Sequence, residues 1–306
     1  MMRRLKDVLT SLVIGAAACA SLALPVAAGT GQPSPWQMGL QNPVTDIAES
    51  INTFHDGVNI VIIAITIFVL ILLAIVVFRF NETANPTPSK TTHHTGLEVA
   101  WTIIPVFILV GIAVPSFKLL FAQYTYPKAD VTLKATGNQW NWTYQYPDHG
   151  NFNFTSIMLN EAERGELIKK GIKAPRLLAV DNEVIVPVGK VVHVLVTASD
   201  VIHNWTVPSF GSKTDAVPGR TTATWFRARS EGVFYGQCSE LCGKDHAFMP
   251  IAVRVVKPEI FQQWADLMKD RKRGPARQLI EKAAIEQSGG KIADASAPTS
   301  VAANGN

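Results

Sequence analysis

The chain has 306 residues, of which 47% are hydrophobic and 17% charged, and a formal net charge of +4. This length and composition suffice for a membrane part plus one globular domain of ordinary size. Three cysteines are too few for a disulfide-stapled scaffold, and the sequence has no internal period typical of repeat proteins.

Residues 1–28 have the pattern of a secretory signal peptide. Arg3, Arg4 and Lys6 precede an apolar run, Val8–Ala28, which ends in small residues, as signal peptidase sites do. We expect this segment to be removed, together with one of the three cysteines. The alternative is an uncleaved first membrane helix.

Two further apolar runs are long enough to cross a bilayer. The uncharged stretches Gly57–Phe78 (22 residues) and Val99–Phe117 (19 residues) compare with the ~20 residues that a span needs. The second stretch contains two prolines, which membrane helices tolerate. We expect helices at about 57–78 and 99–120, forming a transmembrane hairpin within residues 29–125. The alternative for each run is the buried core helix of a soluble protein.

The sequence from 126 to 257 changes to short β-rich runs with turn residues between them. Val, Thr and aromatic residues at this spacing predict an antiparallel sandwich or barrel. The expected strands include 130–135, 183–187, 191–197, 221–228, 232–235 and 251–256. Residues 258–306 are predicted to form a C-terminal helix, extending to Gln287, and a disordered tail.

One short loop of this domain concentrates metal-binding side chains. Within a dozen residues it carries two thiolates, an imidazole and a thioether, at Cys238, Cys242, His246 and Met249. Soft copper prefers this ligand set, and a further imidazole, His203, lies upstream. Nearby glycines and Pro250 favour a loop between two strands over a helix. A cupredoxin presents copper on such a loop, so we expect an all-β, cupredoxin-like domain.

Other readings of these residues remain open. Cys238 and Cys242 could form a disulfide, or two Cys and two His could hold structural zinc. Cys238, Cys242 and His246 could also line one stripe of a helix. Met249 favours copper, because a thioether adds little for zinc but serves copper as a weak axial ligand. Two cysteines one short turn apart offer two bridging thiolates and so favour a dinuclear copper centre.

The same loop resembles a known family. Residues 235–243 read Tyr-Gly-Gln-Cys-Ser-Glu-Leu-Cys-Gly and, with His246 and Met249, resemble the CuA-binding signature of cytochrome c oxidase subunit 2. Segment 200–205 resembles the loop that carries the first histidine in that family, and segment 214–220 resembles the segment that follows this loop. The resemblance therefore covers most of the expected mature chain.

The resemblance implies a ligand set for a dinuclear copper centre. Cys238 and Cys242 would bridge both coppers, and His203 and His246 would bind one copper each. Met249 would bind one copper, and the backbone carbonyl of the glutamate between the two cysteines would bind the other.

The resemblance also implies roles for three residues beyond these side-chain ligands. Besides its carbonyl, Glu240 would direct its side chain to a magnesium ion at the boundary with the catalytic subunit. Glu98 begins a segment similar to the start of the family's second helix, where the matching glutamate lies at the mouth of a proton channel. Trp140 matches the exposed tryptophan that receives the electron from cytochrome c.

The stretch around Trp140 carries a further expectation and one departure. Four aromatic residues alternate with polar ones and should share one face of a strand, at 140, 142, 144 and 146. The alternative there is a plain hydrophobic face. Gln145 stands where many family members carry a glutamate that helps to dock cytochrome c. Asp148 and Asp200 are the remaining candidates for docking.

Together with the signal peptide and the two spans, the resemblance implies a multi-pass subunit of a bacterial haem–copper oxidase in the inner membrane, with its copper domain in the periplasm. The expected partners are cytochrome c, the haem-containing catalytic subunit, other oxidase subunits and lipid, with no nucleic acid. The chain alone should not reduce oxygen. The competing hypotheses are a nitrous oxide reductase, a copper-free quinol oxidase subunit and a zinc-stabilised, membrane-anchored binding module.

Overall fold

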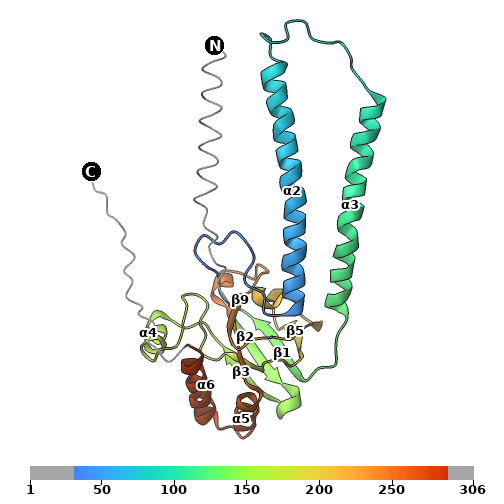
Figure 1. Cartoon of the computed structure of the whole chain (residues 1–306). Helices are drawn as coiled ribbons and strands as arrows, with labels where there is room; N and C mark the ends of the chain where they lie inside the picture. Colours follow the sequence, from blue (N-terminus) through green and yellow to red (C-terminus); the bar gives the residue numbers. More distant parts are fainter. Residues whose placement is uncertain (1–30, 289–306) are drawn as a thin grey trace, which may run out of the picture.

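The computed structural model describes residues 31–288. Two long helices rise together from one end of a β domain and are joined at their far ends by a loop (Figure 1). This arrangement confirms the predicted helical hairpin followed by a β domain. The predicted signal peptide and the predicted tail beyond residue 288 lie outside the described residues.

Helix α2 (Asp46–Arg79) begins eleven residues before the apolar run that predicted it. The side chain of Thr45 caps it by accepting a hydrogen bond from the amide of Ala48 at 3.0 Å, and acidic residues occupy the first turn. At 34 residues the helix is about 51 Å long, whereas the hydrocarbon core of a bilayer is about 30 Å thick. The surplus lies at the end nearest the β domain.

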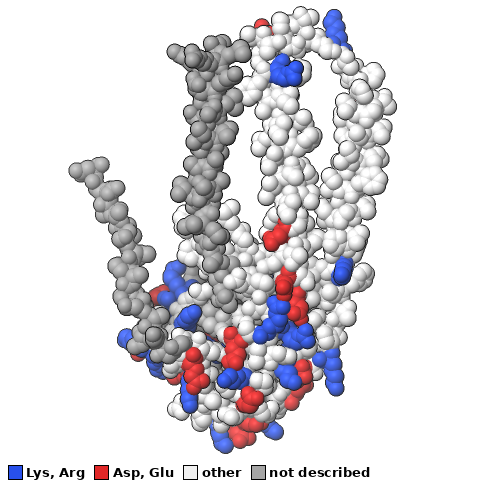
Figure 2. Space-filling view, viewed as in Figure 1, with Lys and Arg blue, Asp and Glu red and all other residues white. Residues whose placement is uncertain are grey.

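Helix α3 (Thr95–Tyr124) contains Pro105 and Pro115 and is also longer than its apolar core. Both helices are long and apolar enough to cross a membrane, and their apolar side chains are exposed along the spans. Figure 2 shows charged side chains on the β domain and near the connecting loop, with an almost uncharged band over the helices between them. Lipid is the solvent that suits this band.

Ion pairs join the start of α2 to the β domain. Just after strand β8 (Thr222–Phe226), Arg227 reaches the Asp46 carboxylate at 2.6 Å, and Arg229 reaches Asp46 at 3.3 Å and Glu49 at 2.6 Å. Exposed pairs of this kind contribute about 0–1 kcal/mol each, so their main effect is on orientation. They connect the helix to a sheet edge rather than to a loose linker.

Three sheets make up the β domain. The strands are β1 (Val131–Asn138), β2 (Asn141–Tyr146), β3 (Phe152–Ser156), β4 (Val184–Pro187), β5 (Val192–Ala198), β6 (His203–Val207), β7 (Ser212–Ala216), β8, β9 (Gly232–Gln237) and β10 (Pro250–Val256). Their orders are β3-β2-β1-β5-β8, β4-β10-β9 and β6-β7. The predicted sandwich is observed, but it is mixed, because β1 pairs with β5 and β4 with β10 in parallel.

The core lies between these sheets. Burial alternates along β1, β2 and β5, as expected for strands with one face packed inward. Trp142, Tyr144 and Tyr146 are fully buried. Trp140 does not share their face, because the pairing of Asn138 with Asn141 places it in the two-residue turn between β1 and β2.

Three helices surround the end of the domain remote from α2. The charged segment between β3 and β4 forms α4 (Glu161–Lys169). The C-terminal segment forms two helices, α5 (Pro258–Lys269) and α6 (Arg273–Gln287), where one was predicted. Leu267 accepts a hydrogen bond from Lys272 at 2.8 Å across the turn between them. Trp264 of α5 packs edge-on against Tyr146 of β2, with ring centroids 5.2 Å apart.

Candidate copper site

The predicted metal-binding side chains converge at one end of the β domain. The loop between β9 and β10 carries four of them, and His203 is the first residue of β6. The two sulfurs of Cys238 and Cys242 are 3.9 Å apart. Nδ1 of His203 lies 3.9 Å from the Cys238 sulfur, and Nδ1 of His246 lies 3.4 Å from the Cys242 sulfur. The Met249 sulfur is 3.6 Å from that of Cys242.

Four of these five donors are also withdrawn from water, whereas His246 is partly exposed. His203 has no exposed surface, and Cys238, Cys242 and Met249 are at most 6% exposed. A disulfide would need its sulfurs about 2.05 Å apart, so the cysteines are free thiols here. Two thiols, two imidazoles and a thioether facing one small volume fit a soft metal.

The two thiols differ in acidity. Burial would raise the pKa of Cys238, but hydrogen bonds with the His203 ring and with the backbone of Asn204 and Glu240 lower this pKa to about 7. Burial and the neighbouring charge of Cys238 raise the pKa of Cys242 to about 12. A metal that binds both sulfurs therefore displaces at least the Cys242 proton.

Asp200 orients the upstream histidine, a role that the sequence did not predict. Its carboxylate lies 2.8 Å from Nε2 of His203 and also accepts the amide of Gln139 at 2.7 Å. A carboxylate only accepts, so Nε2 carries a proton, and Nδ1 is the ring nitrogen that faces the Cys238 sulfur and would bind a metal there. Carboxylates commonly hold metal-binding histidines in this way. An aspartate three residues before a candidate histidine was the available signal.

The turn that carries Trp140 contacts the metal loop directly. Nε1 of Trp140 donates to the carbonyl oxygen of Cys242 at 3.2 Å, and Nε2 of Gln139 donates to the same oxygen at 2.8 Å. The following residue, Gly243, has a φ of 122°, and a Cβ there would lie 2.9 Å from the Trp140 ring. The loop therefore needs glycine at this position. Lys244 places its ammonium 5.6 Å from the centre of the same ring.

Two buried contacts fix the base of the site. Nε1 of Trp142 donates to the carbonyl oxygen of Met249 at 3.2 Å, which holds the end of the metal loop against β2. A Cβ on Gly137 would lie 2.8 Å from the His203 ring, so this ring sits against bare backbone of β1. Backbone and core thus help to position these donors.

Comparisons with known proteins match most of this chain to one family. The family described as "Cytochrome C oxidase subunit II, periplasmic domain" matches residues 131–256, and the one described as "Cytochrome C oxidase subunit II, transmembrane domain" matches residues 33–119. A probable cytochrome c oxidase subunit 2 of Rickettsia bellii is 46% identical over 76% of this chain and 84% of its own length. Subunit 2 of Cereibacter sphaeroides is 44% identical over 77% and 82%.

The chain belongs to the cytochrome c oxidase subunit II family.

Two solved structures are also similar. The periplasmic domain of subunit II of cytochrome oxidase (CoxB) of Bradyrhizobium japonicum is 55% identical over 48% of this chain and 99% of its own, with a TM-score of 0.44. A second structure is a mixed disulfide intermediate between thioredoxin-like TlpAs and subunit II; it is 54% identical over 48% of this chain and 96% of its own, with a TM-score of 0.41. The periplasmic domains of this family bind CuA.

The two glutamates singled out in this subunit II sequence lie in different settings. The carbonyl of Glu240 accepts from the Cys238 thiol at 3.3 Å, and its side chain is exposed. Glu98 lies in the first turn of α3, where its carboxylate accepts the amide of His94 at 3.3 Å. The His94 ring in turn accepts the amide of Leu97 at 3.2 Å. Glu98 therefore also helps to cap its helix.

The candidate docking residues are engaged in local hydrogen bonds. Gln145 donates to Asn151 at 2.6 Å, and Asp148 accepts the amide of Thr132 at 3.0 Å. Asp200 serves His203, as described above. Each aspartate thus has a structural role independent of any partner.

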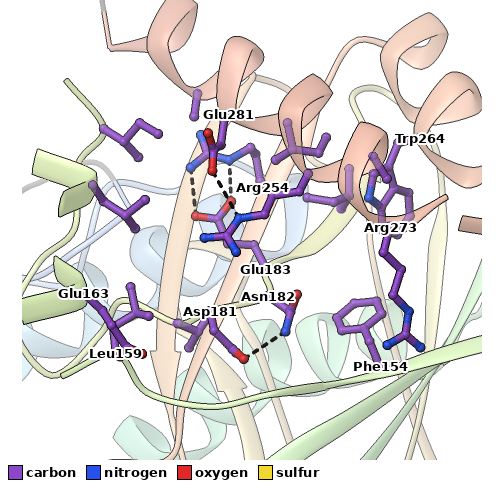
Figure 3. A pocket seen from close by; sticks show the side chains of 18 of the residues that line it. Phe154, Leu159, Glu163, Asp181, Asn182, Glu183, Arg254, Trp264, Arg273 and Glu281 are labelled. Atoms are coloured by element: carbon purple, nitrogen blue, oxygen red, sulfur yellow. Dashed lines mark hydrogen bonds and ion pairs between the residues drawn. The ribbon is translucent and has the colours of Figure 1, made fainter. Parts of the chain in front are cut away.

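A cavity away from the metal donors lies between α4 and helices α5 and α6 (Figure 3). Its volume is about 910 Å³, and it is lined by none of the metal donors. Arg254 reaches the Glu183 carboxylate at 2.8 Å, and Lys170 bridges to Glu281 at 3.1 Å. The cavity is therefore separate from the copper site, and its charged groups pair with one another.

Proposed function

We propose that this chain is the electron-accepting subunit of a cytochrome c oxidase. It would take electrons from cytochrome c at a dinuclear CuA centre and pass them to haem in the catalytic subunit, where oxygen reduction is coupled to proton pumping. The observation that carries the proposal is the pair of unbonded sulfurs of Cys238 and Cys242, with His203, His246 and Met249 around them.

The residues suit a dinuclear copper centre, which when bound supplies one electron shared between two metals. Six groups would hold this centre: the side chains of Cys238, Cys242, His203, His246 and Met249 and the backbone carbonyl of Glu240. Asp200 holds the His203 ring, and Trp142 holds the Met249 backbone. Donors held in this way move little when charge changes, which favours fast electron transfer.

We assign electron input to Trp140. Its ring is partly exposed at the domain surface, and its indole is hydrogen-bonded to the Cys242 carbonyl. A short covalent path continues from that carbonyl to the Cys242 sulfur. A cytochrome c that covered the indole would thus be separated from the ligand residue Cys242 by Trp140 alone.

Two glutamates carry further proposals. Glu98 would help to load protons at the membrane face opposite the copper domain, where α3 begins. The exposed carboxylate of Glu240 would bind magnesium where this subunit meets the catalytic subunit. Residues 1–28 would direct export, so that the copper domain lies in the periplasm.

A thioredoxin-like partner is part of the same proposal. One relative forms a mixed disulfide with such a protein. Cys238 and Cys242 are close enough to be oxidised to a disulfide after modest movement, and a disulfide could not bind copper. A thioredoxin-like reductant would therefore keep the pair ready for metal.

Copper loading of the purified full chain would test the proposal. We expect two coppers per chain and an EPR spectrum in which one unpaired electron couples equally to both copper nuclei. A chain that preferred zinc and gave no such spectrum would instead be a structural metal module. A copper-free chain would correspond to the quinol oxidase alternative.

A further inference from the structure

A short uncharged segment before α2 exposes large apolar side chains. Residues 31–45 contain no Asp, Glu, Lys or Arg. Trp36 is 92% exposed, Met38 99% and Leu40 42%. A soluble surface seldom presents such side chains in a row without a partner.

Residues 34–39 of this segment form a turn that is closed by its own hydrogen bonds. The amide of Gln37 donates to the carbonyl of Ser34 at 3.2 Å, while the Gln37 side chain accepts from the Ser34 amide and donates to the Gly39 carbonyl, both at 3.0 Å. Polar groups at the tip are thus satisfied internally. Such a turn can enter the lipid interface without leaving its polar groups unpaired.

Trp36 occupies a backbone position that normally carries glycine or asparagine. It is the third residue of the Ser34–Gln37 turn, after Pro35, and its φ is 60°. A bulky residue in this region is strained, and an exposed indole gains nothing from water. The position therefore suits a side chain that is buried against something outside the chain.

The anchoring contacts place the turn near the membrane surface. Its base is fixed by hydrogen bonds from Asn52 of α2 to the Gln41 carbonyl at 3.3 Å and from the Val44 amide to Ser209 at 3.0 Å. Asn52 lies five residues before the apolar span, which is about 7.5 Å along the helix. The headgroup region on each side of the hydrocarbon core is about 5–8 Å thick. In Figure 1 the segment lies at the end of the domain from which both helices rise.

We propose that residues 34–40 are a membrane-interface anchor, with Trp36 and Met38 inserted among the lipid headgroups of the leaflet that faces the copper domain. Tryptophan is favoured at this depth. Because the segment has no charge, its binding should not depend on anionic lipid or on salt, in contrast to a polybasic anchor. The anchor would add a third attachment to the two spans.

Fluorescence quenching by brominated lipids tests this anchor. The full chain is placed in bilayers brominated near the headgroup, and the emission of Trp36→Phe is subtracted from that of wild type, which isolates Trp36 among seven tryptophans. We expect loss of most Trp36 emission, with or without anionic lipid. The matched control is Trp264→Phe, because Trp264 is buried in α5, and its isolated emission should persist.

The same measurement in the assembled oxidase decides the occupant. Quenching of Trp36 there as well supports the lipid anchor. Quenching in the isolated chain alone would assign the turn to a neighbouring subunit, and no quenching in either preparation would leave it in water; both results overturn the proposal. As a second readout, Trp36→Gly removes the indole at a position that favours glycine. In bilayers it should speed oxidation of Met38 by a water-soluble oxidant, and an unchanged rate would contradict the anchor.

Discussion

The indole of Trp140 and the peptide carbonyl of Cys242 are joined by a direct hydrogen bond of 3.2 Å across 102 residues of sequence. This bond ties the turn between β1 and β2 to the loop that carries four metal donors. Surface ring and ligand residue therefore hold a fixed separation. Electron input and metal binding can be tested separately because Gln139 supports the same carbonyl.

Replacing Trp140 with Phe should slow electron input several-fold or more and leave the copper content unchanged. Phe keeps an aromatic ring but cannot donate to Cys242, while the Gln139 side chain still does. Rapid-mixing reduction by cytochrome c measures the rate, and metal analysis measures the copper. The matched control is Gln139→Leu, which removes the other bond and keeps the indole. If Gln139→Leu slowed input as much, the loop position rather than the ring would be responsible.

Asp200→Asn should weaken copper binding by about 10–100-fold, the usual effect of losing a carboxylate that orients a metal-binding histidine. The variant loses the charged acceptor 2.8 Å from Nε2 of His203. Copper competition with a chelator measures the affinity. Asp148→Asn removes the same charge from a residue that bonds only to a backbone amide at 3.0 Å, and it should retain wild-type affinity. Equal losses in both variants would indicate a general effect of charge.

Met249→Leu should retain copper but shift its EPR spectrum and raise its reduction potential. Loss of an electron-donating thioether favours the reduced metal, and leucine fills the same buried space at a cost below about 1.5 kcal/mol. Redox titration of the copper-loaded chain gives the potential. An unchanged reduction potential would argue against Met249 as a copper ligand.

Gly137→Ala should destabilise the domain by about 1–3 kcal/mol, because the new methyl group would overlap the His203 ring. Denaturant unfolding followed by tryptophan emission measures the change. Gly165→Ala is the opposite case, since nothing lies within 4 Å of a Cβ built there, in the middle of α4. That variant should gain about 0.5–1 kcal/mol from helix propensity. Destabilisation of similar size in both variants would contradict the close packing at Gly137.

The apolar spans and the metal loop could be predicted because their signals are local. A membrane span is recognised from the length and apolar composition of one continuous run. The loop from Cys238 to Met249 likewise holds four of the five side-chain donors in one short segment. Strands β3, β6 and β7 were not among the strands named from the sequence. Strand β6 is buried at four of its five residues and shows no alternation, while β7 is mostly polar. Only their pairing in space reveals them.

Trp140 shows where periodicity alone misleads. It continues the alternation of Trp142 and Tyr144, but the chain reverses between Asn138 and Asn141. The reversal is set by hydrogen bonds to β1, which a period of two does not contain. In the same way, the early start of α2 follows from the cap at Thr45 and not from hydropathy.

The β domain is attached to the start of α2 by ion pairs, which join Arg227 and Arg229 to Asp46 and Glu49. The helix therefore sets how the domain is turned relative to the membrane. Each residue added to a helix moves the domain at its end by 1.5 Å along the helix axis and rotates that domain by about 100°. One residue inserted or deleted between these pairs and the apolar span would thus rotate the copper site about the axis of α2. The distance of the site from the membrane would change little. The number of residues in that stretch therefore sets which neighbour the copper loop faces.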